Sequence, residues 1–247
     1  SESKDAILRA RKTFFSHRKE LEEYVSGHES FLKSFTPVRV NTDVRVVNMM
    51  ALAAELSEVG PMAAVAGALA DLMLEAMKEG TSQEGIDDSP ARIALVENGG
   101  EIAIDSEEPM KIALYAGHNE LNLRIGFLIE KKDCPLGLGT SSASIGHAVS
   151  LGEADAATIF ARDAALADAA ATRICNLVKG EDVEKSIKRA LDAVDDIEGV
   201  RGALISRGNK VGQAGSLPKM FKIKGKKAKL LERKVKDLDP DHFDKIY

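Results

Sequence analysis

Two oxygen-bearing side chains, Asp168 and Thr172, lie four residues apart in an alanine-rich stretch of this 247-residue chain. The stretch "RDAALADAAATRICNLVKG" predicts a helix that ends at Gly180, because alanine is the strongest helix former and glycine ends helices. Residues four apart share one helix face, so the carboxylate and the hydroxyl are within reach of a single cation. Oxygen ligands suit Mg²⁺, which keeps waters or recruits substrate phosphates. The alternative interpretation is an alanine-rich packing helix with one polar stripe.

A second candidate is the run "PLGLGTSSAS" at residues 135–144. Read as a loop before a helix, it resembles the phosphate loop of the galactokinase and homoserine kinase superfamily, in which backbone N–H groups at a helix N-terminus hold ATP phosphates. A continuous helix is not expected after it, because Gly146 and Gly152 interrupt a strand-like stretch. That superfamily's early Pro-Gly-Arg segment and late glycine-rich loop have no counterpart either. A small-molecule kinase is therefore the less favoured interpretation.

Hydrophobic periodicity predicts the elements that would position these residues. Helices are predicted over residues 6–26, 44–56, 61–79, 162–179 and 182–197. Strands are predicted over residues 91–98, 99–105, 110–116 and 122–130 as an antiparallel meander, over 154–161, and in a hairpin around "RGNK" within 200–215. The segment "FLKSFTPVRV" is predicted to be extended or turn-like around Pro37. Helices, then strands, then helices flanking more strands predict one α+β domain over residues 1–247.

Composition limits the classes of function. The chain is 44% hydrophobic and 30% charged, as is typical of globular proteins, and its net charge of −5 argues against general nucleic-acid binding. The basic run "KIKGKKAKLLERKVK", in a charged C-terminal extension at about 219–247, is predicted to be a solvated surface segment. The apolar stretches are too short for a membrane span. The first residues lack the apolar region of a secretory signal, so we expect a cytoplasmic protein with reduced cysteines.

Four segments occur together and in order: "VGPMAAVAGA" at 59–68, "VENGGEIAI" at 96–104, "GTSSASIGHAVSLGEADAATIFA" at 139–161 and "ALADAAAT" at 165–172. In this combination the chain resembles the ApbE-like superfamily, whose best-known members are FAD:protein FMN transferases, and within it a short branch of uncharacterised proteins. The resemblance covers residues 59–179 and, more loosely, the N-terminal helix with "SFTPV", and it leaves the C-terminal extension outside. It implies an α+β fold with a T-fold-type antiparallel sheet and helices packed on it.

The resemblance also implies a site for FAD and Mg²⁺. The metal that holds the FAD pyrophosphate would be bound at Asp168 and Thr172. The flavin or other nucleotide would be contacted by a tight turn and a hydroxyl-rich loop, which consist of Asn98, Gly99, Gly100, Glu101, Thr140, Ser141 and Ser142. Glu101 stands where an aspartate is common in the family. The reaction implied is transfer of FMN from FAD to an acceptor protein.

His147 and Cys134 are the candidates for direct catalysis. His147 is similar to a histidine near the transferase active site, but the histidine-proline segment that follows there has no equivalent in this chain. Cys134 and Cys175 could act as a nucleophile or sulfur carrier only with a lowered thiol pKa. A member that binds a small anionic ligand, or that serves sulfur assimilation through a cysteine, is therefore the alternative to a transferase. Whether the apolar helices pack within one subunit or across a homodimer stays open.

Overall fold

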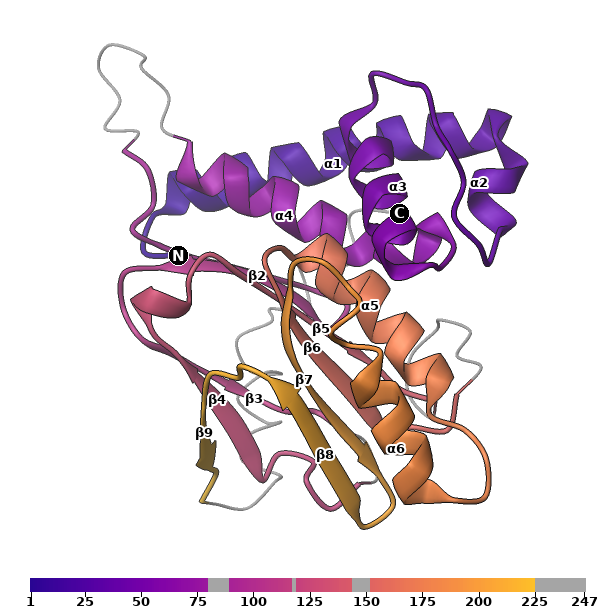
Figure 1. The fold of residues 1–247 in the computed structure, drawn as a ribbon. Helices are drawn as coiled ribbons and strands as arrows, with labels where there is room; N and C mark the ends of the chain where they lie inside the picture. Colours follow the sequence, from indigo (N-terminus) through magenta and orange to yellow (C-terminus); the bar gives the residue numbers. More distant parts are fainter. Residues whose placement is uncertain (80–88, 117–118, 144–151, 225–247) are drawn as a thin grey trace, which may run out of the picture.

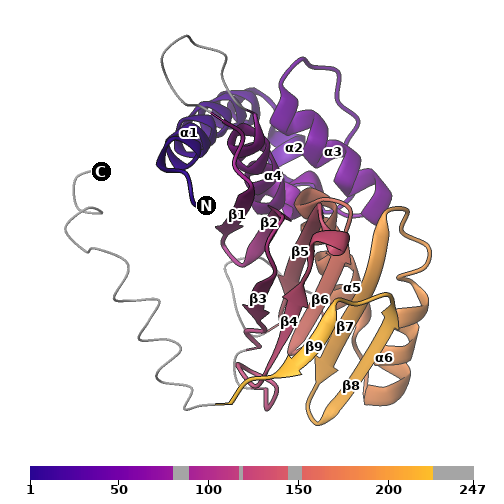
Figure 2. The same cartoon turned by 90° about the vertical axis from the view of Figure 1, so that its left-hand side faces the viewer.

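The computed structural model describes residues 1–79, 89–116, 119–143 and 152–224, and it has three layers (Figure 1). Helices cover one face of a six-stranded antiparallel sheet, and a three-stranded antiparallel sheet covers the other face (Figure 2). The α+β fold class predicted from the sequence is thereby confirmed. Among the described residues no single helix is long and apolar enough to span a membrane, and the one helix pair that qualifies jointly is bent by 105°.

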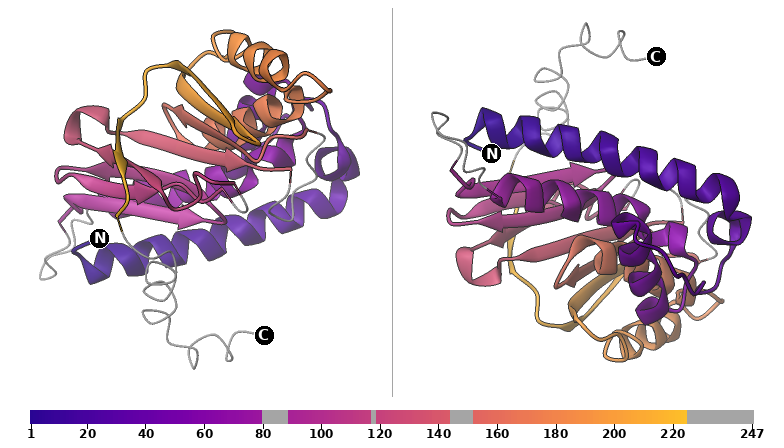
Figure 3. Two further views of the ribbon diagram at one scale, coloured as in Figure 1. Left: turned by 90° about the horizontal axis from the view of Figure 1, so that it is seen from below. Right: turned by 90° about the horizontal axis from the view of Figure 1, so that it is seen from above.

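The helices follow the predicted periodicity closely. They are α1 (Lys4–Gly27), α2 (Glu29–Lys33), α3 (Arg45–Ser57), the 3₁₀ turn η1 (Pro61–Ala64), α4 (Val65–Lys78), the short 3₁₀ turn η2 (Lys131–Asp133), α5 (Ala164–Leu177) and α6 (Val183–Asp192). Figure 3 shows α1 running alongside α4 on the outside of the helical layer. Apolar residues of α3, η1 and α4 form one buried cluster with Ala165 and Ala169 of α5. This cluster fixes the first turn of α4 against α5.

The large sheet has the strand order β1-β2-β5-β6-β7-β8, and the small sheet has the order β3-β4-β9. The strands are β1 (Ile93–Asn98), β2 (Glu101–Ser106), β3 (Met110–Ala113), β4 (Ile125–Ile129), β5 (Leu136–Ser141), β6 (Ala156–Ala161), β7 (Val200–Arg207), β8 (Lys210–Gly215) and β9 (Lys219–Lys222). Phe127 of the small sheet packs edge-on against Phe160 of the large sheet, with ring centroids 4.8 Å apart. The core between the two sheets is thus apolar and aromatic.

One prediction about the strands is wrong. The four strands between residues 91 and 130 do not form one meander, because β1 and β2 join the large sheet while β3 and β4 form the small one. The segment around Pro37 is extended or turn-like as predicted, and only its first residues, 31–33, belong to the helix α2. At the start of the C-terminal extension, residues 219–222 form β9, which pairs with β4, and most of the basic run lies outside the described residues.

The run "PLGLGTSSAS" is also not a loop at its centre. Residues 136–141 form β5, an inner strand between β2 and β6. A Cβ atom on Gly137 would lie 2.1 Å from the backbone of Asp163, and one on Gly139 would lie 2.5 Å from the backbone of Ala167. The two glycines therefore let α5 lie directly on β5. This packing role replaces the phosphate-loop interpretation, and with it the small-molecule kinase.

Candidate functional site

The turn between β1 and β2 is a two-residue hairpin. Gly99 and Gly100 have φ angles of 74° and 117°, which favour glycine at both positions. Asn98, at the end of β1, donates a hydrogen bond from its side-chain amide to the carbonyl oxygen of Ala66, at 2.9 Å. This hydrogen bond joins the hairpin turn to the first turn of α4. The "NGGE" and "VGPMAAVAGA" segments therefore lie close together.

Asp168 lies at the same helix end. Its carboxylate accepts a hydrogen bond from the backbone N–H of Gly67 at 3.0 Å and another from the N–H of Ala66. These are N–H groups in the first turn of α4, which have no partner within the helix, and Ala64 at the N-cap offers no hydrogen-bonding side chain. Asp168 therefore caps α4 from a neighbouring helix.

A second aspartate makes the reciprocal contact. Asp71 of α4 accepts hydrogen bonds from the N–H groups of Ala164 and Ala165, at 2.9 and 2.8 Å, in the first turn of α5. Gly67 permits this crossing of the two helices, because a Cβ atom there would lie 2.1 Å from the carbonyl oxygen of Ala164. Each helix thus holds the N-terminus of the other through one carboxylate.

Glu101 brings another carboxylate to this place. It begins β2, its side chain is only 9% exposed, and its carboxylate accepts a hydrogen bond from the backbone N–H of Thr140. Burial is the main cause that raises the pKa of Glu101 to about 7, and nearby Glu97 acts in the same direction. Burial, and next the charge of Glu101, raise the pKa of Asp168 well above its usual value. Two carboxylates therefore interact at the start of α4.

The hydroxyl-rich segment ends beside this pair. The Thr140 hydroxyl hydrogen-bonds to the hydroxyl of Thr158, with the oxygens 3.0 Å apart, and Thr158 is 2% exposed. Ser141 is the last residue of β5 and pairs with Ala157 of β6. Ser142 follows directly, half-buried. The strand thus directs its hydroxyl-bearing end toward the hairpin turn, and Thr140 reaches Glu101 through its backbone.

The oxygen atoms present are chemically suited to Mg²⁺. A carboxylate has about four lone-pair sites, so two N–H bonds leave Asp168 able to accept further partners. Thr172, half-buried and one turn further along α5, shares its face. No group of three or more His, Cys, Asp or Glu residues that could hold a metal occurs among the described residues. Such a site therefore requires ligand phosphates or water to complete the six-coordinate shell of Mg²⁺.

The cysteines lie elsewhere. Cys134 precedes β5 and Thr140 is near its other end, about 20 Å away at the usual rise of a strand. Burial raises the pKa of the Cys134 thiol, and the carboxylates of Asp105 and Asp133 add to the shift. Cys175 is fully buried. The environment of Cys134 therefore does not stabilise a thiolate, and His147 lies outside the described residues.

Sequence reasoning did not single out Asp71 and Thr158. The signal for Asp71 was present, because the tetrapeptide Ala-Leu-Ala-Asp occurs at residues 68–71 and again at 165–168. The two copies end in the two capping aspartates. Thr158 carries no comparable signal, because a threonine in an apolar strand is common and only the strand register places it opposite Thr140.

The fold and the site together define an α+β protein in which two interacting carboxylates, a glycine turn and a hydroxyl-bearing strand end meet at one helix N-terminus. The family model described as AbpE bacteria matches residues 2–201, and the chain belongs to this ApbE-like family. A UPF0280 protein of Methanocaldococcus jannaschii is 38% identical over 224 residues, which cover 90% of this chain and 87% of the relative. A UPF0280 protein of Methanopyrus kandleri is 39% identical over 233 residues, which cover 93% and 90%.

A solved structure is also similar. The ApbE protein of Thermotoga maritima matches with a TM-score of 0.44 and 16% sequence identity. The match covers 64% of this chain and 51% of the Thermotoga chain.

Proposed function

We propose that the chain binds FAD through Mg²⁺ at the start of α4 and transfers FMN from it to a hydroxyl of an acceptor protein. The observation that carries the proposal is the meeting of Asp168 and Glu101 beside the Gly99–Gly100 turn. Family membership supports a flavin-related ligand, since the residues concerned lie in the family's signature segments. Asp168 and Thr172 would hold Mg²⁺, which when bound neutralises charge on the pyrophosphate.

In the proposed reaction, the acceptor oxygen attacks the phosphorus atom of the FMN half of FAD. The bond from that phosphorus to the bridging oxygen breaks, AMP leaves with this oxygen, and the acceptor hydroxyl loses its proton. Glu101 is assigned as the group that takes the proton, because its pKa of about 7 leaves a large ionised fraction near neutral pH. The N–H groups of Ala66 and Gly67 would hold Asp168 in place throughout.

The test is titration of the purified protein with FAD, with and without Mg²⁺, followed by flavin fluorescence. We expect Mg²⁺-dependent binding that weakens at least about 100-fold in Asp168→Asn, because the charged ligand to the cation is lost. The matched control is Asp71→Asn, which changes the same position of the same tetrapeptide away from Glu101 and should keep the affinity within about threefold. FAD binding that is independent of Mg²⁺ and of Asp168 would contradict the proposal.

Binding and transfer are separated by a second readout. With Glu101→Gln we expect FAD still to bind, while the release of AMP in the presence of an acceptor, measured by chromatography, falls by at least about tenfold. Binding without any release of AMP from the unmodified protein would leave FAD as a bound ligand and remove the transferase part of the proposal.

A further inference from the structure

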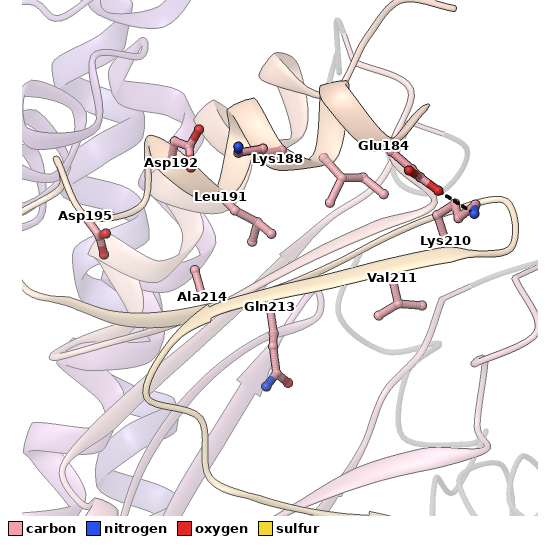
Figure 4. A pocket seen from close by; sticks show the side chains of 10 residues that line it. Glu184, Lys188, Leu191, Asp192, Asp195, Lys210, Val211, Gln213 and Ala214 are labelled. Atoms are coloured by element: carbon pink, nitrogen blue, oxygen red, sulfur yellow. Dashed lines mark ion pairs between the residues drawn. The ribbon is translucent and has the colours of Figure 1, made fainter. Parts of the chain in front are cut away.

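A groove of about 440 Å³ lies between α6 and β8, at the opposite edge of the large sheet from the turn at residues 98–101 (Figure 4). β8 is the last strand in the sheet order, and its outer edge has no partner strand in the part of the chain that the structure describes. Gly212 lets α6 lie close above β8, because a Cβ atom there would lie 2.7 Å from Ile187 and from Leu191. The volume is within the range of pockets that bury several side chains or a small ligand.

The groove is apolar in its middle and acidic at one end. Leu191 and Ile187 contribute the apolar part, and Glu184 forms an ion pair with Lys210 at the far end. Asp192 and Asp195 are exposed at the other end of the groove and have no ion-pair partner among the described residues. Figure 4 shows both on the same side of Leu191. Lys188 also lines the groove and offsets one of these two carboxylates, so an excess of one negative charge remains beside Leu191. The groove therefore favours an apolar side chain with positive charge next to it.

The chain itself contains such a segment just beyond its described part. Residues 226–236 read "KKAKLLERKVK", in which Leu230 and Leu231 lie between Lys229 and Arg233. The described chain ends at Lys224, after β9, and Figures 1 and 2 place the end of β9 and the β7–β8 hairpin at the same end of the molecule. The six residues from Lys224 to Leu230 span at most about 20 Å, at roughly 3.3 Å each. All 23 residues after Lys224 span more than 70 Å when extended, at roughly 3.3 Å each.

We propose that residues 226–236 dock in the groove between α6 and β8 of the same chain, with Leu230 and Leu231 against Ile187 and Leu191. The basic side chains of the segment then face Asp192 and Asp195. Because the charged part of this contact is exposed to water, salt weakens it. The groove lies at the opposite edge of the large sheet from the carboxylate pair, so this inference does not depend on the proposed FAD site.

The experiment is carbodiimide cross-linking of the full-length protein, which joins lysines to carboxylates in direct contact. Equal amounts of unlabelled and ¹⁵N-labelled protein are mixed, and the linked peptides are identified by mass spectrometry. We expect links from lysines of residues 226–236 to Asp192 and Asp195, each within one isotopic copy. Their yield should fall at least about fivefold between 0.05 and 0.5 M salt.

The decisive variant carries Leu230→Ser and Leu231→Ser, which leaves every reactive group in place. We expect it to lower the yield of these links about tenfold, whereas the control Leu238→Ser, outside the segment, keeps it. Equal yields in both variants would show random encounters of a tethered tail and overturn the proposal. Links between labelled and unlabelled copies would assign the groove to a second molecule, and an absence of links would leave it to a small ligand; either result overturns docking within one chain.

Discussion

Helices α4 and α5 carry the same tetrapeptide, Ala-Leu-Ala-Asp, and use it differently. Asp71 on α4 is 7% exposed and accepts two N–H groups of α5. Asp168 on α5 is half-buried, accepts the corresponding N–H groups of α4, and in addition interacts with Glu101. One motif thus supplies a buried cap in one helix and a cap that interacts with the carboxylate of the hairpin turn in the other. The neighbouring hairpin turn, and not the motif, makes the difference.

The largest effect on stability is expected from Asp71→Ala. The substitution leaves the buried N–H groups of Ala164 and Ala165 without their acceptor, so we expect the free energy of unfolding to fall by about 2–3 kcal/mol. Asp168→Ala should cost less, about 1–2 kcal/mol, because Ala66, one of the two residues whose N–H it accepts, is half-buried, whereas Ala164 and Ala165 are both buried. Urea denaturation followed by circular dichroism measures both. An equal loss of unfolding free energy in the two variants would contradict the proposed difference between the two caps.

A further prediction concerns the dependence of stability on pH. Burial raises the pKa of Asp71 to about 7, so between pH 4 and 7 the folded state holds a proton there that the unfolded state has lost. Stability from this group is therefore complete below about pH 4 and is lost as pH rises to about 7, with a slope of at most about 1.4 kcal/mol per pH unit.

Asp71→Asn should make the pH dependence of unfolding shallower in that window. The control is Asp182→Asn, because the N–H of Lys185 lowers the pKa of Asp182 in the fold. Its stabilising effect is present above its ordinary pKa and is lost below it, so this variant should change the profile only in more acidic solution. An unchanged slope in Asp71→Asn would show that Asp71 is ionised in the folded protein at pH 4–7.

The smallest effect is expected from Cys134→Ser. The thiol lies at the opposite end of β5 from Thr140, so Mg²⁺-dependent FAD binding should stay within about twofold of its original affinity. The same flavin titration measures it. A loss comparable to that of Asp168→Asn would mean that the ligand extends along β5, or that the thiol takes part in the function.

The sequence predicts the helices well because each has its own periodicity, stop signal or cap. For α5 the alanine-rich run, the Asp163 cap and the following Gly180 are all local signals. The division of the strands into two sheets is not local, since β2 pairs with β5 across 30 residues and β4 pairs with β9 across 90. Strand propensity carries no information on such partners. The glycines of β5 suggest a loop for the same reason. The helix that packs closely on them, α5, begins about 25 residues later in the chain.

The candidate site is predicted in part. Asp168, Asn98 and Glu101 were identified from their segments, and the structure brings them together at one helix end. Their hydrogen-bond partners were not identified, because backbone N–H and carbonyl groups leave no trace in the residue types. Whether these residues bind FAD and Mg²⁺ stays a prediction for the titrations described above.

The reciprocal caps have a consequence for how the protein reaches its folded state. Asp71 and Ala164 are separated by 93 residues, and Gly67 and Asp168 by 101, so neither helix start can be satisfied until the chain has been synthesised as far as α5 and has collapsed. A partly folded chain thus has no complete carboxylate site to offer. A ligand that binds there selects the finished fold and, by mass action, protects all of it against unfolding.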